Sequence, residues 1–359
     1  MVKKLFSVII AATMLFCIPV FAANPTTEST ITIDKNLKVI NATLTSVAGP
    51  GLTYTYAIAP ETPSATNGGT SITDSTGTAG NVKAGPNGGV TLSSNTVSWP
   101  ADTAVTASPS GADNVKSFTA TADISKFEGP GIYRYKITET ATPANPATIG
   151  VTDSDPAEVR YLDVYVENKP TQKAEGSTYQ IAGIVMHNGD LTSGKKTFDD
   201  STFETINITL KNIVSGTMGD REHLFPFEGT ITDNGRFFYA QKSESPSADD
   251  SFKVTNGSVK TSLANEEMYY INGLSTVARI QYKETNDTPD TYEVNYTNGT
   301  TSNVAPTNEK AMAAVDAMDI VFENKLDSAS LTGIDLRYGA YIGIILFGLA
   351  LIIINRKTK

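Results

Sequence analysis

Residues 31–39 read ITIDKNLKV and place a lysine among apolar residues. In a β-strand successive side chains point to opposite faces, so Lys35 shares its face with Ile33 and Leu37, whereas Lys38 falls on the polar face. Lys35 therefore either enters the core or lies at a rim where its stem covers apolar surface and its amine reaches water. A buried lysine has a chemical use, because burial disfavours the charged form and a neutral amine is a nucleophile.

Two glutamates follow the same alternation. Glu139 shares a face with Tyr135 and Ile137 in GIYRYKITET, and Glu284 occupies the matching place in ARIQYKET. Both carboxyl groups are therefore predicted to point into a core, where burial raises the pKa of a carboxyl group.

Amide and carboxyl side chains stand near the ends of the two series of strands. Asn324 follows Phe322 on one face of the last strand, and Asp200 follows Phe198 at the corresponding place in the first series. A neutral lysine amine could attack the side-chain carbonyl of Asn or Asp while a protonated glutamic acid polarises it and transfers protons. The product is an amide between side chains, with ammonia lost from Asn or water from Asp. A buried salt bridge is the alternative for Lys35.

The two ends of the chain carry targeting signals. The first residues combine two lysines, an apolar run and small residues before a polar segment, which is typical of a secretory signal. An uncharged apolar stretch near the C-terminus approaches the length of a membrane span and is followed by basic residues. The sequence thus predicts a signal peptide over 1–22, a first domain over 23–204, a second over 205–325, a sorting segment over 326–337, a transmembrane helix over 338–355 and a cytoplasmic tail over 356–359.

Composition narrows the class of protein. The single cysteine, Cys17, lies within the predicted signal, so the exported chain has no disulfide available. A net charge of -10 argues against nucleic acid as a partner. Short alternating runs between turn-rich stretches predict an all-β fold. With two histidines and no phosphate loop or metal-spaced cluster, the sequence gives no indication of an enzyme, a cofactor or a metal site.

The strand series repeat one another, since YRYKITET in the first series matches IQYKETND in the second, and ITIDKNLKV matches ITLKNIVSG. In the order ITIDKNL, FEGPGIYRYKITE, VSGTMGDR, VFENK and SLTG, the chain resembles the backbone pilins of Gram-positive, sortase-assembled pili, particularly the two-domain streptococcal T-antigen type. The resemblance implies two tandem Ig-like (Cna-B-like) β-sandwiches. It also implies a first-domain isopeptide bond from Lys35 to Asp200, catalysed by Glu139, with Asp199 or Asn207 as alternative acceptors.

The second domain departs from this pattern. Glu284 and Asn324 fall on the family's glutamate and asparagine, but the position of the lysine holds Asn212. Lys211 is one residue away, and a shift of one residue in a strand reverses the face. Unless a bulge turns Lys211 inward, the second domain should lack the bond, and Asn212 should hydrogen-bond to Glu284 or Asn324.

The tail carries the remaining expectations. ASLTG fits the position of a sortase motif, with Thr332 as the acyl donor and cleavage before Gly333. Leu331 stands where proline is usual, which implies a dedicated pilus sortase. Lys195 or Lys196 is the candidate amine that would accept the next subunit. The implied partners are the sortase, other copies of the chain, peptidoglycan and the host surface. The implied location is the cell surface; a surface adhesin that does not polymerise is the alternative.

Overall fold

The computed structural model describes residues 29–65, 69, 71–73, 79–169, 178–188, 197–242, 245–285, 292–298, 301–304 and 318–327. These residues form strands joined by turns and three short 3₁₀ helices, so the predicted all-β class is confirmed. The predicted signal peptide, sortase motif, membrane helix and basic tail lie outside the described residues. Within the described ranges, none of the helices has the length and the apolar character needed to cross a bilayer.

The chain divides into two compact units. Unit 1 comprises residues 1–206 together with 233–238 and 273–277, and unit 2 comprises 207–232, 239–272 and 278–359. The division falls inside one long strand, β14 (Ser201–Ser215), which ends unit 1 and begins unit 2. Two short segments of the second series of strands thus belong to unit 1, a feature that the sequence pattern does not indicate.

Unit 1 has two main sheets. One has the order β14-β1-β9-β6, with β11 beside β14; the other has the order β13-β12-β10-β3-β7, with β5 and β4 beyond β10, and β2 pairs with β8. The bounds are β1 (Thr30–Ile40), β2 (Ser46–Ala48), β3 (Leu52–Pro60), β4 (Ser71–Thr73), β5 (Ala79–Ala84), β6 (Val90–Leu92), β7 (Thr96–Trp99), β8 (Ala104–Thr106), β9 (Ala112–Ala122), η1 (Ile124–Lys126), β10 (Gly131–Thr142), η2 (Pro146–Ile149), β11 (Val151–Thr152), β12 (Val159–Asn168) and β13 (Tyr179–His187).

Unit 2 repeats the two-sheet arrangement around the rest of β14. One sheet contains β17, β16, β19, β14, β23, β21 and β22, and the other has the order β18-β15-β20. The bounds are β15 (Phe225–Thr232), β16 (Phe238–Gln241), η3 (Asp250–Phe252), β17 (Lys253–Val254), β18 (Ser258–Leu263), β19 (Met268–Ser275), β20 (Arg279–Glu284), β21 (Glu293–Asn298), β22 (Thr301–Val304) and β23 (Met318–Lys325).

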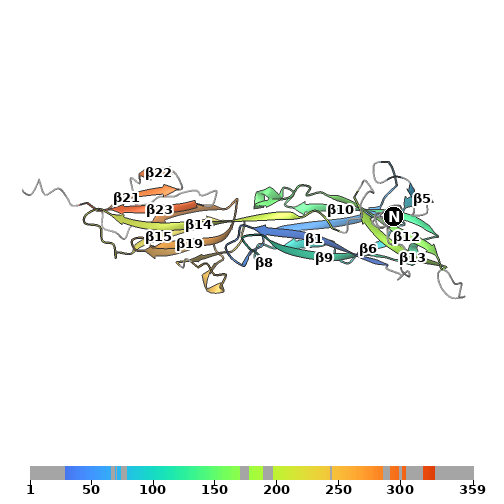
Figure 1. Cartoon of the computed structure of the whole chain (residues 1–359), viewed down its shortest axis with the longest axis horizontal. Coiled ribbons are helices and arrows are strands. Elements are labelled where there is room, and N and C mark those ends of the chain that lie inside the picture. Colours follow the sequence, from blue (N-terminus) through green and yellow to red (C-terminus); the bar gives the residue numbers. More distant parts are fainter. Residues whose placement is uncertain are drawn as a thin grey trace, which may run out of the picture. The chain divides into compact units, whose positions relative to one another are not determined.

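In each unit the first and the last strand of the series are parallel neighbours in one sheet. In unit 1, β1 lies between β9 and β14 and runs parallel to β14, with Leu37 opposite Ser201 (Figure 1). In unit 2, β14 runs parallel to β23, with Val214 opposite Asn324. Because these strands are paired side by side, residues that are far apart in sequence lie opposite one another in the sheet.

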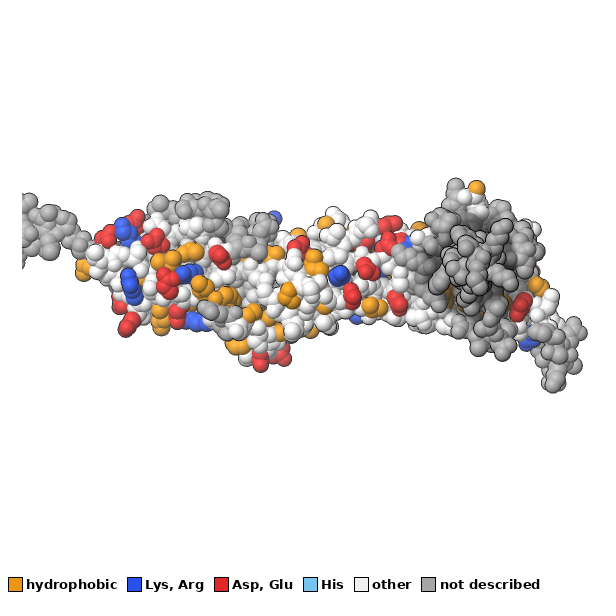
Figure 2. All heavy atoms as spheres, viewed as in Figure 1, with side chains coloured by type: hydrophobic (Ala, Val, Ile, Leu, Met, Phe, Trp, Pro, Cys, Tyr) orange, Lys and Arg blue, Asp and Glu red, His pale blue; other side chains and the backbone are white. Residues whose placement is uncertain are grey.

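Each core is filled by aromatic side chains between the sheets. In unit 1 the ring of Tyr56 on β3 lies 4.4 Å from Phe118 on β9 and 4.9 Å from Phe198, centroid to centroid. In unit 2 Phe227 on β15 lies 5.1 Å from Phe322 on β23. Burying one such ring contributes roughly 1.5–3 kcal/mol. On the face drawn in Figure 2, acidic, basic and hydrophobic side chains of the described residues are interspersed, and the polar clusters described below are interior.

Candidate functional site

Lys35 lies in the core of unit 1. The burial of β1 alternates along the strand, and the side chain of Lys35 is 0% exposed. Its Nζ donates to Glu139 Oε1 at 2.9 Å and to the backbone oxygen of Asp199 at 2.7 Å. The same Nζ lies 3.7 Å from Asp153 Oδ2 and 4.1 Å from the centroid of the Tyr54 ring. The rim interpretation of Lys35 is therefore wrong, and its amine faces carboxyl groups in a site closed to solvent.

Glu139 is held from the opposite sheet. It lies on β10 across from Tyr56 of β3, and its side chain is fully buried. The Tyr56 hydroxyl donates to Glu139 Oε2 at 2.7 Å, while the lysine occupies Oε1. Burial raises the pKa of Glu139 to about 7, although the positive charge of Lys35 opposes the rise. A carboxyl group with such a pKa can both accept and return a proton near neutral pH.

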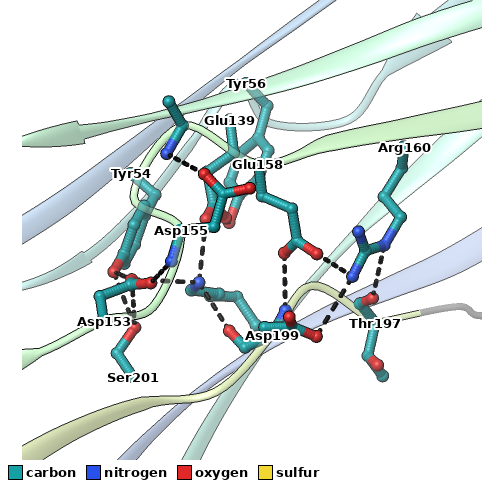
Figure 3. A network of polar contacts seen from close by, with 12 residues as sticks. Tyr54, Tyr56, Glu139, Asp153, Asp155, Glu158, Arg160, Thr197, Asp199 and Ser201 are labelled. Carbon is teal, nitrogen blue, oxygen red and sulfur yellow. Dashed lines mark hydrogen bonds and ion pairs between the residues drawn. The ribbon is translucent and has the colours of Figure 1, made fainter. Parts of the chain in front are cut away.

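A second carboxyl group meets the lysine from a loop. Asp153 follows the short strand β11, which pairs antiparallel with β14. Its Oδ2 accepts hydrogen bonds from Ser201 Oγ at 3.0 Å and from the hydroxyl of Tyr54, and its Oδ1 accepts from the backbone N–H of Asp155 at 3.0 Å. Figure 3 shows Tyr54, Asp153 and Ser201 together on one side of the cluster. Burial, followed by the hydrogen bond to Asp153, raises the pKa of Tyr54, so its hydroxyl stays protonated and donates.

The acidic residues expected to accept the bond lie elsewhere. The Asp199 carboxylate is 41% exposed and pairs with Arg160 at 3.3 Å, on the other side of the cluster in Figure 3. Asp200 is exposed, and Asn207 lies further along β14 in unit 2. Among the described residues, the hydrogen bonds and ion pairs of Lys35 go to neither Asp200 nor Asn207.

Glu158 and Arg160 hold the segment that leads into β14. Glu158 accepts a hydrogen bond from the Asp199 backbone N–H at 2.8 Å and pairs with Arg160. Arg160 also donates to the backbone oxygen of Thr197 at 3.3 Å. These contacts hold the backbone of Asp199 in place, which in turn keeps its carbonyl oxygen against the amine of Lys35. Burial raises the pKa of Glu158 as well.

Unit 2 contains a corresponding cluster, and its described members include no cation. Asn212, Glu284 and Asn324 are all buried. Asn324 Nδ2 donates to Asn212 Oδ1 at 3.0 Å and to Glu284 Oε2 at 3.1 Å, as expected for an asparagine in the lysine position. Burial raises the pKa of Glu284 to about 7, and the hydrogen bond from Asn324 opposes the rise. In the part of the chain that the structure describes, Asn324 Oδ1 has no hydrogen-bond partner.

Lys211 points away from this second cluster. It is half-buried at the surface, where it forms an ion pair with Glu266. The pairing of β14 with β23 is regular through this stretch, with Lys211 opposite Val321 and Asn212 opposite Phe322. The predicted outward orientation of Lys211 is therefore confirmed, since no bulge reverses the faces over the described pairing of β14 with β23. Among the described residues, the buried cluster of unit 2 contains no amine.

Sequence reasoning identified the lysine, the glutamates and the asparagines on regular strands, but it missed a loop carboxyl group and the hydroxyl groups around it. It did not find Asp153, which follows a two-residue strand, or the hydroxyl groups of Tyr54, Tyr56 and Ser201. An aspartate near an Asp-Ser-Asp turn was the only available signal, and such turns are common on surfaces. Thr332, Gly333, Lys195 and Lys196 lie outside the described residues. Within the described ranges, the acidic, histidine and cysteine side chains form no group able to hold a metal ion.

Comparisons with known proteins bear on both units. Residues 206–320 match a family described as a domain of unknown function, DUF7601. Over 273 residues the chain is 29% identical to a protein named pilin from Streptococcus pyogenes serotype M1, a match that covers 70% of this chain and 75% of that protein.

Solved structures show the same fold. A crystal structure of the major pilin from Streptococcus pyogenes matches with a TM-score of 0.51 and 21% identity, covering 83% of this chain and 99% of that one. A mutant of the same major pilin matches with a TM-score of 0.50 and 20% identity over the same shares. The chain is thus similar to streptococcal major pilins along most of its length.

Proposed function

We propose that this chain is a structural subunit of a cell-surface pilus, exported and joined covalently to other copies of itself by a sortase. The similarity to a streptococcal pilin over 70% of the chain supports the subunit role. In this proposal the units are tandem Ig-like sandwiches of the Cna-B type, and the shaft is anchored to peptidoglycan. Contact with a host surface is part of the same proposal.

The observation that carries the proposal is the buried pair of Lys35 and Glu139. Burying a charged lysine has a large desolvation cost, and a hydrophobic pair of similar volume would give a comparable or greater stability. A lysine kept next to a glutamic acid that titrates near neutral pH instead fits a reaction in which Glu139 moves protons while the amine forms an amide. No external enzyme is needed for this step.

The cross-link would strengthen the subunit where tension acts. Lys35 lies on the first strand of unit 1, and β14 is its parallel neighbour and its connection to unit 2. A covalent bond in this region would prevent β1 from separating from the rest of unit 1 when the chain is pulled. It would replace the disulfides that a chain without cysteine beyond Cys17 cannot form.

Assembly would use the tail and the first unit. Thr332 would supply the acyl group after cleavage before Gly333, and Lys195 or Lys196 of the next subunit would supply the amine. A transmembrane helix over 338–355 would hold the precursor until the sortase acts. The basic tail over 356–359 would stay in the cytoplasm.

The test is polymerisation on the native cell surface. Cell-wall extracts probed with an antibody to this chain should give a ladder of heavy species that resists boiling in detergent. Deletion of the pilus sortase or the substitution Thr332→Ala should abolish the ladder, and the paired Lys195→Ala and Lys196→Ala substitutions should leave single anchored subunits. A single species in the wild type would contradict the pilus role and support a surface adhesin that does not polymerise.

A further inference from the structure

A comparison of the strand registers of the two units shows that β14 brings no carboxyl or amide side chain to the cluster of unit 1. Asn324 lies on β23 opposite Val214, two residues beyond Asn212, and Ser201 lies on β14 opposite Leu37, two residues beyond Lys35. Ser201 therefore occupies in unit 1 the position that Asn324 occupies in unit 2. A serine side chain has no acyl carbon, so the residue at this position cannot form an amide with the lysine.

Asp153 supplies a carboxyl group at the same level. β11 pairs with β14 so that Val151 faces Phe203 and Thr152 faces Thr202, and this antiparallel order brings the next residue, Asp153, to Ser201. The hydrogen bond of 3.0 Å between Ser201 Oγ and Asp153 Oδ2 confirms the contact. The side chains of Lys35 and Asp153 are both 0% exposed, and Nζ lies 3.7 Å from Oδ2.

We propose that Lys35 Nζ and Asp153 Cγ form an intramolecular amide, so that the acyl group comes from the loop after β11 and not from the last strand. This inference rests on the proposed function, because it names the acceptor of that cross-link. The neutral amine attacks Cγ of the protonated carboxyl group, a C–N bond forms, and one carboxyl oxygen leaves as water. The neutral amine and the neutral carboxylic acid together supply every atom of the amide and of the water, so no proton comes from outside.

In this balance the attacking nitrogen keeps one hydrogen as the amide N–H and gives up the other, which combines with the departing hydroxyl group to form the water. Glu139 is placed to move that proton, since its Oε1 lies 2.9 Å from Nζ. Tyr54 and Ser201 donate to Asp153 Oδ2, and these hydrogen bonds polarise the acyl group and stabilise the negative charge that develops on its oxygen. The cluster thus holds a nucleophile, an acyl group, a proton carrier and hydrogen-bond donors.

The other carboxyl groups near the lysine are less suited to accept the bond. Asp199 presents its backbone oxygen to Nζ and turns its carboxylate to Arg160. Asp200 is exposed. Glu139 lies closest to the amine, but a bond to Glu139 itself would consume the group that carries the proton.

The experiment is peptide mapping by mass spectrometry of the full-length chain purified from cells. The wild type should give a branched peptide that joins Lys35 to Asp153 and weighs one water less than its two parts. Asp153→Ala should abolish that peptide, whereas the matched control Asp200→Ala should keep it. Glu139→Gln should leave both parts linear, because the proton carrier is gone.

Asp153→Asn separates a chemical role from a folding defect. An asparagine would lose ammonia where the aspartate loses water, so the branched peptide of this variant should have the same mass as that of the wild type. If the bond involved another residue of the same peptide, position 153 would keep its side-chain amide. The branched peptide would then be lighter than that of the wild type by the mass difference between a carboxyl and an amide group, and this result would overturn the proposal.

Two further results would also overturn it: linear Lys35 and Asp153 peptides in the wild type, or a branched peptide that joins Lys35 to Asp199, Asp200 or Glu139. Neither result affects the sortase ladder, which depends on Thr332 and is read from the same cells. Loss of the ladder with an intact Lys35–Asp153 peptide would instead contradict the pilus role and leave the internal bond standing.

Discussion

The buried clusters of the two units lie at matching positions on matching strands, but each cluster lacks a different chemical group. Unit 1 has the amine, Lys35, but carries Ser201 at the level where unit 2 carries Asn324. Unit 2 has the amide, but its first strand carries Asn212 in place of a lysine. A loop residue, Asp153, adds a carboxyl group to the first cluster only. The comparison indicates that the matching strands alone are not sufficient for a cross-link, because each unit also needs a nucleophile and an acyl group on the same level.

The glutamates are the part that does not differ. Burial raises the pKa of Glu139 and of Glu284 to about 7 in their separate cores. Glu139 faces a cation, whereas Glu284 faces the amide of Asn324. The same raised pKa thus belongs to a group beside a buried lysine amine in one unit and to a group hydrogen-bonded to an amide in the other.

The largest effect is expected from Glu139→Ala. This change removes the nearer of the two carboxyl groups that pair with the buried Lys35 and leaves only Asp153, which costs up to about 3–5 kcal/mol. It also prevents the cross-link, which contributes about 4–5 kcal/mol in the chain-entropy model for loops on the order of 100 residues. Calorimetry of the full-length chain should show a large fall in the unfolding temperature of unit 1.

Glu284→Ala is the matched control for that change. It removes a buried carboxyl group without leaving a buried charge, so it should cost roughly 1–3 kcal/mol, the penalty for the Asn324 amide that loses its acceptor. Equal losses from the two variants would show that Glu139 has only a packing role and would remove the difference between the clusters.

The second effect is a gain in unit 2 from Asn212→Lys. The substitution supplies the missing amine beside Glu284 and Asn324, so an amide should form with loss of ammonia and stabilise unit 2 by about 4–5 kcal/mol if its loop is on the order of 100 residues. Intact mass and calorimetry check the two expectations together. The same variant combined with Glu284→Gln should keep its full mass and lose stability, because an unpaired lysine is then buried.

A variant with Asn212→Lys that keeps its full mass while Glu284 is present would show that the backbone of unit 2 does not bring the groups into reacting geometry. The difference between the units would then lie in the distances between strands and not in one residue.

Residues on regular strands were predictable because the period of two fixes their face. Lys35, Glu139 and Asn324 all lie on the inward faces that alternation assigned to them, and each is buried. Alternation failed for Asp200, which was matched to the face of Phe198 two residues earlier. Phe198 and Ser201 are both buried, whereas Asp200 lies just before β14 begins and is exposed, so the period of two does not hold across this connection.

Asp153 could not be found in this way. It follows a strand of two residues, where alternation carries no information, and it meets Lys35 only because β11 pairs with β14. That pairing joins segments about 50 residues apart in the chain, and it depends on the whole of unit 1 being folded. Loop residues recruited to a core through such contacts lie beyond pattern reasoning on a single sequence.

The third effect concerns pH and the glutamate of unit 2. The pKa of Glu284 rises from an ordinary value of 4.5 to about 7 in the folded state, so the folded chain binds the proton more tightly than the unfolded chain. Its contribution to the free energy of unfolding is therefore full below about pH 4.5 and is lost as the pH rises through 7, by a total on the order of 3 kcal/mol.

Denaturant titrations of the full-length chain at several pH values check this slope, and Glu284→Gln should flatten it for unit 2. The difference between wild type and variant isolates this one group from the other carboxyl groups of the chain. A slope that survives the substitution would assign the pH dependence to other residues and would weaken the case that burial of Glu284 keeps it protonated.

The smallest effect is expected from Lys211→Ala. Lys211 neighbours the inward Asn212 in sequence but lies on the opposite face, where it pairs with the exposed Glu266. Exposed ion pairs contribute about 0–1 kcal/mol, so the unfolding temperature of unit 2 should barely change and the mass of the chain should show no loss beyond the substitution itself. A large destabilisation would mean that Lys211 reaches the core and reacts with Asn324, and unit 2 would then contain its own nucleophile. Lys211 and Asn212 are adjacent in sequence and lie on opposite faces of β14. This variant therefore tests whether the core of unit 2 lacks a lysine amine or receives one from the neighbouring position.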